Sequence, residues 1–182
     1  GNFNPGGKLN VTIPRSAGQI PIFYNHKNGS GYASGSDATS AAIFSGGYTD
    51  GLGTPLYPFG YGLSYTHFQY DDMVLSSNVL KKGENLIISV IVTNEGDYDG
   101  CEVVQLYLHD IYADVVRPVK ELKNFKRIFL KKGESREVRF VITEEDLKFY
   151  NSNLQYVYEL GDFEVMVRTN SRNVQSKTFF AE

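Results

Sequence analysis

Apolar and polar residues alternate along short runs of the chain from residue 66 onward. In the run 137–142, for example, Val138, Phe140 and Ile142 fall on one face because successive side chains of a β-strand point to opposite sides. Runs with one apolar face predict strands at residues 68–75, 86–93, 102–109, 122–130, 137–142, 155–160, 163–168 and 174–180. Short strands at turn spacings of about 8–12 residues predict a mainly β fold, an immunoglobulin-like or fibronectin-like antiparallel β-sandwich.

Two turns and one helical turn are predicted between these strands. The sequence Lys-Lys-Gly-Glu occurs at residues 81–84 and again at residues 131–134, so we expect the same turn at both places. Thr143 followed by three acidic residues predicts a helix N-cap and an acidic first turn, with a single helical turn that runs to Tyr150.

Residues 1–65 lack this repeated pattern. Residues 8–13 alternate and predict one strand that ends at Pro14, and residues 19–24 predict an extended segment, but neither has an obvious partner. Residues 28–53 are rich in Gly, Ser, Ala and Thr, which predicts a long surface loop. Because this part offers too little apolar surface to bury a core of its own, we interpret it as the extended, loop-rich tail of another domain.

Residues 54–65, which we call the strap, are stiff and apolar. Pro55 and Pro58 exclude a helix, and Gly60 and Gly62 supply turns or close backbone approach. A strap of this composition must pack on something, unlike a solvated Gly/Ser linker, and we predict that it docks on a neighbouring domain. The predicted docking residues are Leu56, Tyr57, Phe59, Tyr61, Leu63 and Tyr65.

Composition argues against several partner classes. The net charge is −3, with 18 basic and 21 acidic residues, so no basic field for nucleic acid is present. The basic and aromatic run 115–127 contains Glu121, and we interpret it as a strand edge whose lysines block unwanted sheet pairing. No apolar run is long enough to span a bilayer, and the single Cys101 excludes an intrachain disulfide and a thiolate metal cluster.

Candidate catalytic groups are few. His26, His67 and His109 lie in separate segments at spacings that match no metal site, and no cofactor motif is present, so we predict neither metal nor cofactor. Sugar hydrolysis needs two carboxylates, but most acidic residues here suit turns, strand ends or the helix start. Only Asp37 and Asp50 lie in the unexplained loop and could approach a substrate.

Four stretches resemble the C-terminal part of family 3 glycoside hydrolases, the β-glucosidase and β-xylosidase group. Residues 4–16 and 18–27 resemble the end of that family's α/β sandwich domain, and residues 55–65 are similar to its connector. Residues 117–122, with Phe125 and Gly133-Glu134, are similar to its fibronectin type III-like domain. The resemblance implies three parts: an α/β-domain tail (1–53), the strap (54–65) and a β-sandwich (66–182).

The resemblance also implies that catalysis lies elsewhere. In this family the nucleophilic aspartate belongs to an N-terminal (β/α)8 barrel, and the acid/base glutamate usually comes from an earlier part of the α/β domain. No residue of this chain therefore inherits a catalytic role. Tyr48 and Asp50 match the family's segment before the connector and, with Asp37, are the candidates for a substrate-proximal loop; Tyr156 stands where a tryptophan is common.

The leading hypothesis is a non-catalytic part of a retaining β-glucosidase-like enzyme that hydrolyses terminal β-linked sugars. Its partners would be the preceding catalytic domains of the same polypeptide, and residues 1–65 could also mediate self-association. An alternative is a carbohydrate-binding or protein-interaction module, in which Tyr48, Tyr57 or Tyr61 form a flat platform for polysaccharide. A third possibility is one chain of a split enzyme, which a separate catalytic polypeptide would complete.

Overall fold

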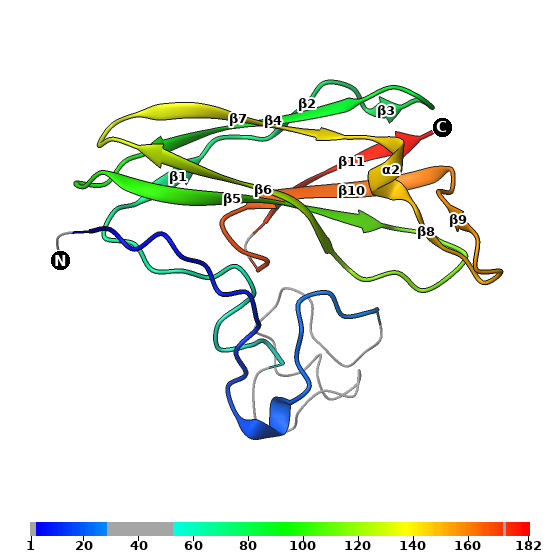
Figure 1. Cartoon of the computed structure of the whole chain (residues 1–182), viewed down its shortest axis with the longest axis horizontal. Helices are drawn as coiled ribbons and strands as arrows, with labels where there is room; N and C mark the ends of the chain where they lie inside the picture. Colours follow the sequence, from blue (N-terminus) through cyan, green and yellow to red (C-terminus); the bar gives the residue numbers. More distant parts are fainter. Residues whose placement is uncertain (1–2, 29–52, 173) are drawn as a thin grey trace.

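The computed structural model of the chain describes residues 3–28, 53–172 and 174–182, and two β-sheets face each other across its core (Figure 1). The first sheet is centred on β4 (Leu86–Asn94), and its other strands are β1 (Phe68–Tyr70), β2 (Val74–Leu75) and β7 (Ser135–Ile142). The second sheet follows the order β3 (Val79–Leu80), β11 (Gln175–Ala181), β10 (Gly161–Arg168), β5 (Gly100–Asp110) and β6 (Glu121–Leu130). The predicted mainly β sandwich is confirmed.

Apolar and polar side chains alternate along the strands, as predicted, and the apolar ones form the core. Along β4 every second residue from Leu86 to Asn94 is buried, and β7 buries Val138, Phe140 and Ile142. These side chains meet those of the second sheet, among them Leu106, Val165 and Phe179. Each large apolar side chain that is removed from water contributes about 1.5–3 kcal/mol to folding, so this cluster is the main source of stability.

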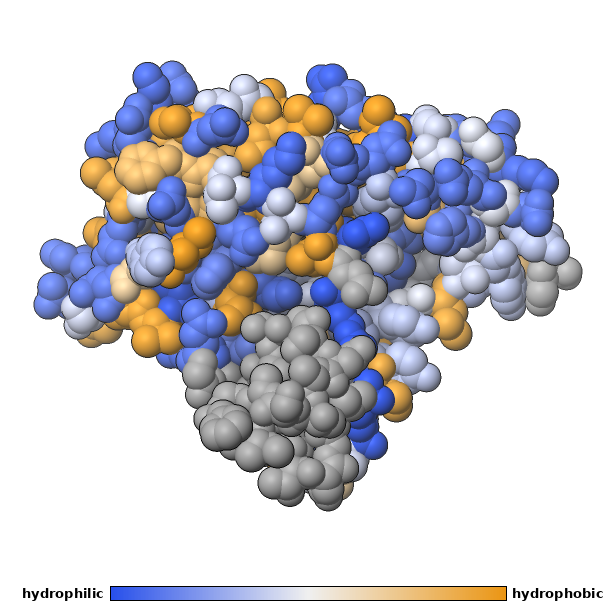
Figure 2. Space-filling view, turned by 180° about the vertical axis from the view of Figure 1, so that it is seen from behind, coloured by the Kyte–Doolittle hydropathy of each residue, from blue (hydrophilic) through white to orange (hydrophobic). Residues whose placement is uncertain are grey.

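The outer face of the first sheet also carries apolar side chains. Val74, Ile87, Ile91 and Val141 are exposed there, and Ile87 lies opposite Val141 in the register of β4 and β7. Figure 2 shows apolar residues gathered on the upper part of the molecule seen from behind. Because exposed apolar residues are common on folded proteins, this face alone indicates no function.

The repeated turn is confirmed. Gly83 and Gly133 have φ angles of 78° and 74°, and in both turns the glutamate N–H donates to the carbonyl oxygen of the first lysine at 2.9 Å. A positive φ at the third position favours glycine because it has no Cβ. The first turn joins β3 to β4, and the second joins β6 to β7.

The helical turn is shorter than predicted. Helix α2 spans Glu144–Leu147, and the Asp146 carboxylate accepts hydrogen bonds from the backbone N–H (2.8 Å) and the hydroxyl (2.9 Å) of Thr143. The prediction that it runs to Tyr150 was wrong, because Phe149 turns into the core and β8 (Phe149–Tyr150) pairs with β9 (Tyr156–Val157).

Two predicted strands are also shorter or divided. The run 68–75 is two strands, β1 and β2, because Met73 between them points into the core and its N–H donates to the Gln175 side chain at 2.8 Å. The run 155–160 contributes only β9. Strand β3, which alternation did not predict, pairs in parallel with β11.

Residues 8–13 do not form the predicted regular strand, but they have a partner. Leu9 and Ile13 exchange backbone hydrogen bonds of 2.8–2.9 Å with the strap, for example from the Leu9 N–H to the Tyr61 carbonyl and from the Ile13 N–H to the Tyr57 carbonyl. Only Ile13 and Tyr57 form a β-bridge, because the prolines of the strap lack the N–H groups that a continuous ladder needs. Of residues 19–24, predicted to be extended, Gln19 belongs to η1 (Ala17–Gln19), a short 3-10 helix, and none lies in a β-strand.

Residues 3–28, which we call the leader, therefore run beside the strap below the second sheet (Figure 1). Among the residues that the structure describes, no helix is long and apolar enough to cross a membrane. The two predicted domain boundaries, after residues 53 and 65, stay a prediction.

Candidate domain-docking site

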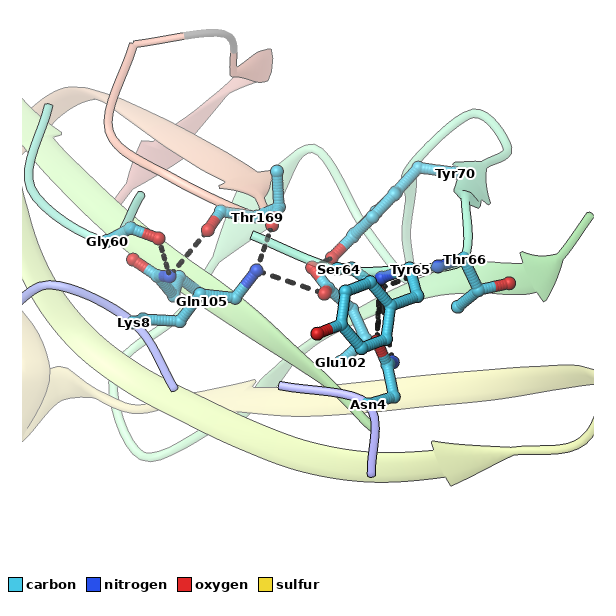
Figure 3. Close-up of polar contacts among 10 residues, drawn as sticks. All are labelled: Asn4, Lys8, Gly60, Ser64, Tyr65, Thr66, Tyr70, Glu102, Gln105 and Thr169. Atoms are coloured by element: carbon cyan, nitrogen blue, oxygen red, sulfur yellow. Dashed lines mark hydrogen bonds and ion pairs between the residues drawn. The ribbon is translucent and has the colours of Figure 1, made fainter. Parts of the chain in front are cut away.

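The strap lies with one side against the outer face of the second sheet. The Gln105 side chain of β5 donates to the Gly60 carbonyl at 3.3 Å and to the Thr169 carbonyl at 2.6 Å (Figure 3). The Phe59 carbonyl accepts a hydrogen bond of 3.0 Å from the backbone N–H of Ser171. Gln105 is buried, so these bonds satisfy a polar group that would otherwise destabilise the fold.

Aromatic stacking extends this contact. Phe59 of the strap stacks on Tyr24 of the leader with ring centroids 4.2 Å apart, and Tyr24 meets Tyr107 of β5 edge-on at 5.8 Å. Burial raises the pKa of the Tyr107 phenol, which donates a hydrogen bond to the Gln105 side chain. Leader, strap and sheet thus share one continuous packed layer.

A buried ion pair joins the leader to the sandwich. The Lys8 ammonium lies 3.0 Å from a Glu102 carboxylate oxygen and donates to the Thr169 hydroxyl at 2.7 Å (Figure 3). The other Glu102 oxygen accepts a hydrogen bond of 2.8 Å from the Tyr70 phenol, and burial, with the Glu102 charge, raises the pKa of that phenol well above its ordinary value. The side chains of Glu102 and Lys8 are 3% and 14% exposed, so the leader supplies the counter-charge for a buried carboxylate.

Two further contacts fix the ends of the strap. At its start the Thr54 carbonyl accepts hydrogen bonds from Arg15 (2.9 Å) and Gln19 (3.3 Å). At its end the Asn4 side chain accepts from the Tyr65 N–H at 2.7 Å and donates to the Ser64 hydroxyl at 3.1 Å. The strap is therefore anchored along its whole length.

The other side of the strap faces solvent. Of the six predicted docking residues, Leu56, Tyr57, Leu63 and Tyr65 are 40–70% exposed, whereas Phe59 and Tyr61 are half-buried. The leader adds four exposed apolar side chains: Phe3, Val11, Ile20 and Phe23. Apolar surface gathered on two adjacent segments is a typical feature of an interaction site.

The platform required by the carbohydrate alternative is not what the strap presents. Tyr57 and Tyr61 stack on each other, with ring centroids 4.8 Å apart and an interplanar angle of 28°, so each ring covers a face of the other. Tyr48, like Asp37 and Asp50, lies outside the described residues. The substrate-proximal loop therefore stays a prediction.

A cleft of about 390 Å³ opens between the leader and the second sheet. Its lining includes His26, His109, Lys120 and Glu164. Burial lowers the pKa of His26 and of Lys120, whose ammonium donates to the Ser171 carbonyl at 2.8 Å. The shared cleft of His26 and His109 could not be predicted from their spacing, because they lie in separate segments of the chain. Within the described ranges, no group of three or more His, Cys, Asp or Glu side chains could hold a metal ion.

The acidic and basic residues interpreted as structural have structural partners. Asp97 pairs with Lys132 at 2.7 Å, and Asp99 accepts a hydrogen bond from the Lys132 N–H at 2.8 Å. Glu121, on the edge strand β6 of the second sheet, binds both Arg117 (2.8 Å), which precedes the strand, and Lys123 (2.9 Å). Residues 121–127 of this run thus lie on an edge strand, whereas the blocking of unwanted sheet pairing by its lysines stays a prediction.

Asp110, at the end of β5, is a half-buried carboxylate whose burial raises its pKa to about 6. The charges of Arg117 and His109 lower this pKa in part, and that of Glu159 raises it. One oxygen of Asp110 is buried without a hydrogen-bond partner among the described residues. The ionised form is therefore disfavoured in the folded protein.

We expect Asp110→Asn to stabilise the chain at neutral pH. Since the folded pKa lies above the unfolded value of 3.8, the favourable contribution of Asp110 is complete below about pH 4 and is lost as the pH rises through about 6. With a discount for its partial exposure, the gain at pH 7 is about 1 kcal/mol. Urea unfolding of both proteins at pH 4 and pH 7 measures this, and an equal difference at both values would contradict it.

Comparisons with known proteins identify the chain's relatives. The model of the fibronectin type III-like domain matches residues 102–171. A periplasmic β-glucosidase from Salmonella typhimurium is 43% identical over 98% of this chain, and a putative β-xylosidase from Formosa agariphila is 41% identical over 98%. This chain corresponds to the C-terminal part of family 3 glycoside hydrolases.

The solved structure of a family 3 relative agrees. A β-glucosidase from Listeria innocua in complex with glucose matches 98% of the chain with a TM-score of 0.86 and 39% identity. The chain spans about a quarter of the length of these relatives: 23% of the Salmonella enzyme, 22% of the Formosa enzyme and 24% of the Listeria chain. These matches confirm the resemblance to family 3 glycoside hydrolases that residues 4–27, 55–65 and 117–122 indicated.

Sequence reasoning missed the residues that anchor the strap to this family 3 sandwich. Glu102 offered a signal, because it falls in phase with the core-facing Val104 and Leu106, where an unpaired charge would be costly. For Gln105 and Thr169 no such signal exists, since Gln105 donates to backbone carbonyls of distant segments and the Thr169 hydroxyl accepts from Lys8, which is far away in the sequence.

Proposed function

We propose that this chain is the non-catalytic C-terminal part of a β-glucosidase-like enzyme, in which it docks on the catalytic domains and stabilises them. Its partners are the preceding domains of the same polypeptide. The parent hydrolyses terminal β-linked sugars with retention of configuration, which requires two carboxylates about 5–5.5 Å apart in those domains. The names of the relatives, β-glucosidase and β-xylosidase, support this substrate class.

The docking role is supported by the difference between the two sides of the strap, of which the inner side is packed on the sandwich and the outer side is exposed and apolar. Its inner side is held on the sandwich by Gln105, by Ser171 and by the stacking of Phe59 on Tyr24. Its outer side leaves Leu63 and Tyr65 70% and 57% exposed. A segment with a fixed backbone and an apolar outer side loses little conformational entropy when a partner covers it. The strap is therefore suited to set the position of the sandwich against the catalytic domains.

This role predicts a selective effect of charge on the outer side of the strap. In the full-length parent, Leu63→Asp places a carboxylate in the apolar contact and is expected to shorten the half-life of activity at elevated temperature by roughly tenfold or more. The initial kcat should change little. Leu160→Asp, at a residue that is 66% exposed outside the leader and strap, serves as the control and should leave the half-life unchanged.

Equal half-lives for Leu63→Asp and the parent would contradict the docking role. The non-catalytic role has a separate test. The purified 182-residue chain should not hydrolyse an aryl β-glucoside, and turnover that copurifies with the chain would contradict that part of the proposal.

A further inference from the structure

Two buried polar atoms at the end of β5 have complementary hydrogen-bonding character. They are Oδ2 of Asp110, the last residue of the strand, and Nε of Arg117, in the loop that follows it. Neither atom has a hydrogen-bond partner among the residues that the structure describes, although buried polar groups are nearly always paired. A carboxylate oxygen accepts hydrogen bonds and a guanidinium N–H donates them, so one small molecule that does both could serve the two atoms.

Other contacts hold both side chains in place. The Nη2 group of Arg117 donates to the Glu121 carboxylate at 2.8 Å, and the guanidinium carbon lies 4.6 Å from the centroid of the Phe149 ring. The Asp110 carboxylate accepts a hydrogen bond from the backbone N–H of Tyr112. Because these contacts would be lost if either side chain turned toward bulk solvent, the two unpaired atoms need a partner inside the protein.

Asp110 and Arg117 both line one cavity of about 10 Å³. This volume is close to the roughly 10–15 Å³ that a single water molecule requires. Apolar side chains form the rest of one wall: Leu108, Leu147 and Phe163. The cavity therefore has the size of one water and the two polar groups that an internal water needs.

The other charged groups in the lining already have partners. Glu121 binds Arg117 and Lys123, and the Asp146 carboxylate accepts from the backbone N–H and the hydroxyl of Thr143. A metal ion does not suit the cavity, because a guanidinium is a cation without a lone pair to offer. Within the described ranges, no cluster of His, Cys, Asp and Glu side chains could hold a metal ion either.

We propose that this cavity binds one internal water molecule, which bridges Asp110 Oδ2 to Arg117 Nε. The water accepts a hydrogen bond from the Nε–H group and donates one to the carboxylate oxygen. The carboxylates of Glu121 and Asp146 offer further acceptors in the lining for its second hydrogen. One water replaces only part of the hydration that a carboxylate has in bulk solvent, so burial still raises the pKa of Asp110.

The bridge fixes a loop that holds the end of the leader. Arg117 is followed by Pro118, which forms a β-bridge with Lys27. The next residue is Val119, whose N–H donates to the His26 carbonyl at 2.9 Å. The water thus connects the end of β5 to the segment that binds the leader.

A high-resolution crystal structure of the purified chain tests the proposal directly. We expect one water peak at about 2.7–3.2 Å from both Asp110 Oδ2 and Arg117 Nε. In solution, the Arg117 Nε–H should show a nuclear Overhauser effect to water, which rotating-frame spectra distinguish from chemical exchange by its sign.

Two variants of Asp110 separate the bridge from the charge. Asp110→Leu replaces both carboxylate oxygens by methyl groups of similar shape and should abolish the Overhauser effect between water and the Arg117 Nε–H. Asp110→Asn also removes the charge but keeps a hydrogen-bonding group, and it should retain the effect. Because Asp110→Leu leaves a buried donor unpaired, its equilibrium constant for unfolding in urea should be about tenfold larger than that of Asp110→Asn.

Three results would overturn the proposal. The first is a crystal structure in which Asp110 Oδ2 and Arg117 Nε bond to each other directly and no water peak lies between them. The second is a peak at about 2.3–2.6 Å from carboxylate oxygens, which would assign a metal ion instead of water. The third is an Overhauser effect that is as strong in Asp110→Leu as in the parent chain.

Discussion

Replacing Lys8 by Met should destabilise the sandwich by about 3–5 kcal/mol, although Lys8 lies in the leader. The substitution keeps the length of the side chain but removes the only cation that the structure places against Glu102, at 3.0 Å, within the described residues. The carboxylate would then stay buried with the Tyr70 hydroxyl as a partner and no counter-charge. Urea unfolding at pH 7 measures the loss.

Two further variants separate this effect from a general loss of packing. The double variant Lys8→Met/Glu102→Gln removes both charges and should recover part of the loss, since a buried amide costs less than a buried unpaired carboxylate. Lys81→Met removes a surface pair, because Lys81 and Glu182 are 60% and 50% exposed, and should change stability by less than about 0.5 kcal/mol. A Lys8→Met protein as stable as the parent would show that the leader does not support the sandwich.

Gly60→Ala should release the strap from the sandwich, at a cost of about 2–3 kcal/mol. Gly60 has a φ of 78°, and a Cβ there would lie 2.1 Å from the Gln105 side-chain oxygen. Relief of that clash moves Gln105 away from the Gly60 and Thr169 carbonyls, so two anchoring hydrogen bonds are lost with it. Hydrogen exchange measures the release, because the Leu9 N–H donates to the Tyr61 carbonyl and should exchange faster in the variant.

Gly83→Ala is the matched control for this substitution. Gly83 also has a φ of 78°, but a Cβ there would meet nothing within 4 Å. Gly83→Ala should therefore destabilise the protein only through backbone strain, by about 1 kcal/mol. Hydrogen exchange of the Leu9 N–H should be unchanged in this variant. If both substitutions had equal effects, close contact with Gln105 would not be what holds the strap.

The sequence predicted the sandwich well because its strands are specified locally. Burial of every second residue in β4 and β7 follows from their own apolar pattern, and Gly83 and Gly133 specify their turns within four residues. The two errors at the β8–β9 hairpin have a tertiary cause. Phe149 ends the helical turn because it packs into the core, and only the structure shows the core position that it fills.

The anchoring of the leader could not be predicted either, and here the reason is the distance between the two partners along the chain. Residues 8–13 alternate like a strand, but their partner is the strap, more than 40 residues away, and proline reduces that pairing to isolated hydrogen bonds. The bonds from Gln105 go to backbone carbonyls, which carry no sequence signal. The docking residues of the strap could be predicted from composition, because apolar side chains in a stiff segment are expected to pack against another surface.

The docking role is tested most directly by hydroxyl-radical labelling of the outer side of the strap. The experiment compares Leu63 and Tyr65 in the isolated chain, where they are 70% and 57% exposed, with the same residues in the full-length enzyme. Tyr98, 62% exposed, is the internal reference. Labelling of Leu63 and Tyr65 should fall several-fold in the full-length enzyme while that of Tyr98 stays constant. Equal labelling in both proteins would contradict the proposal that the strap is a docking surface.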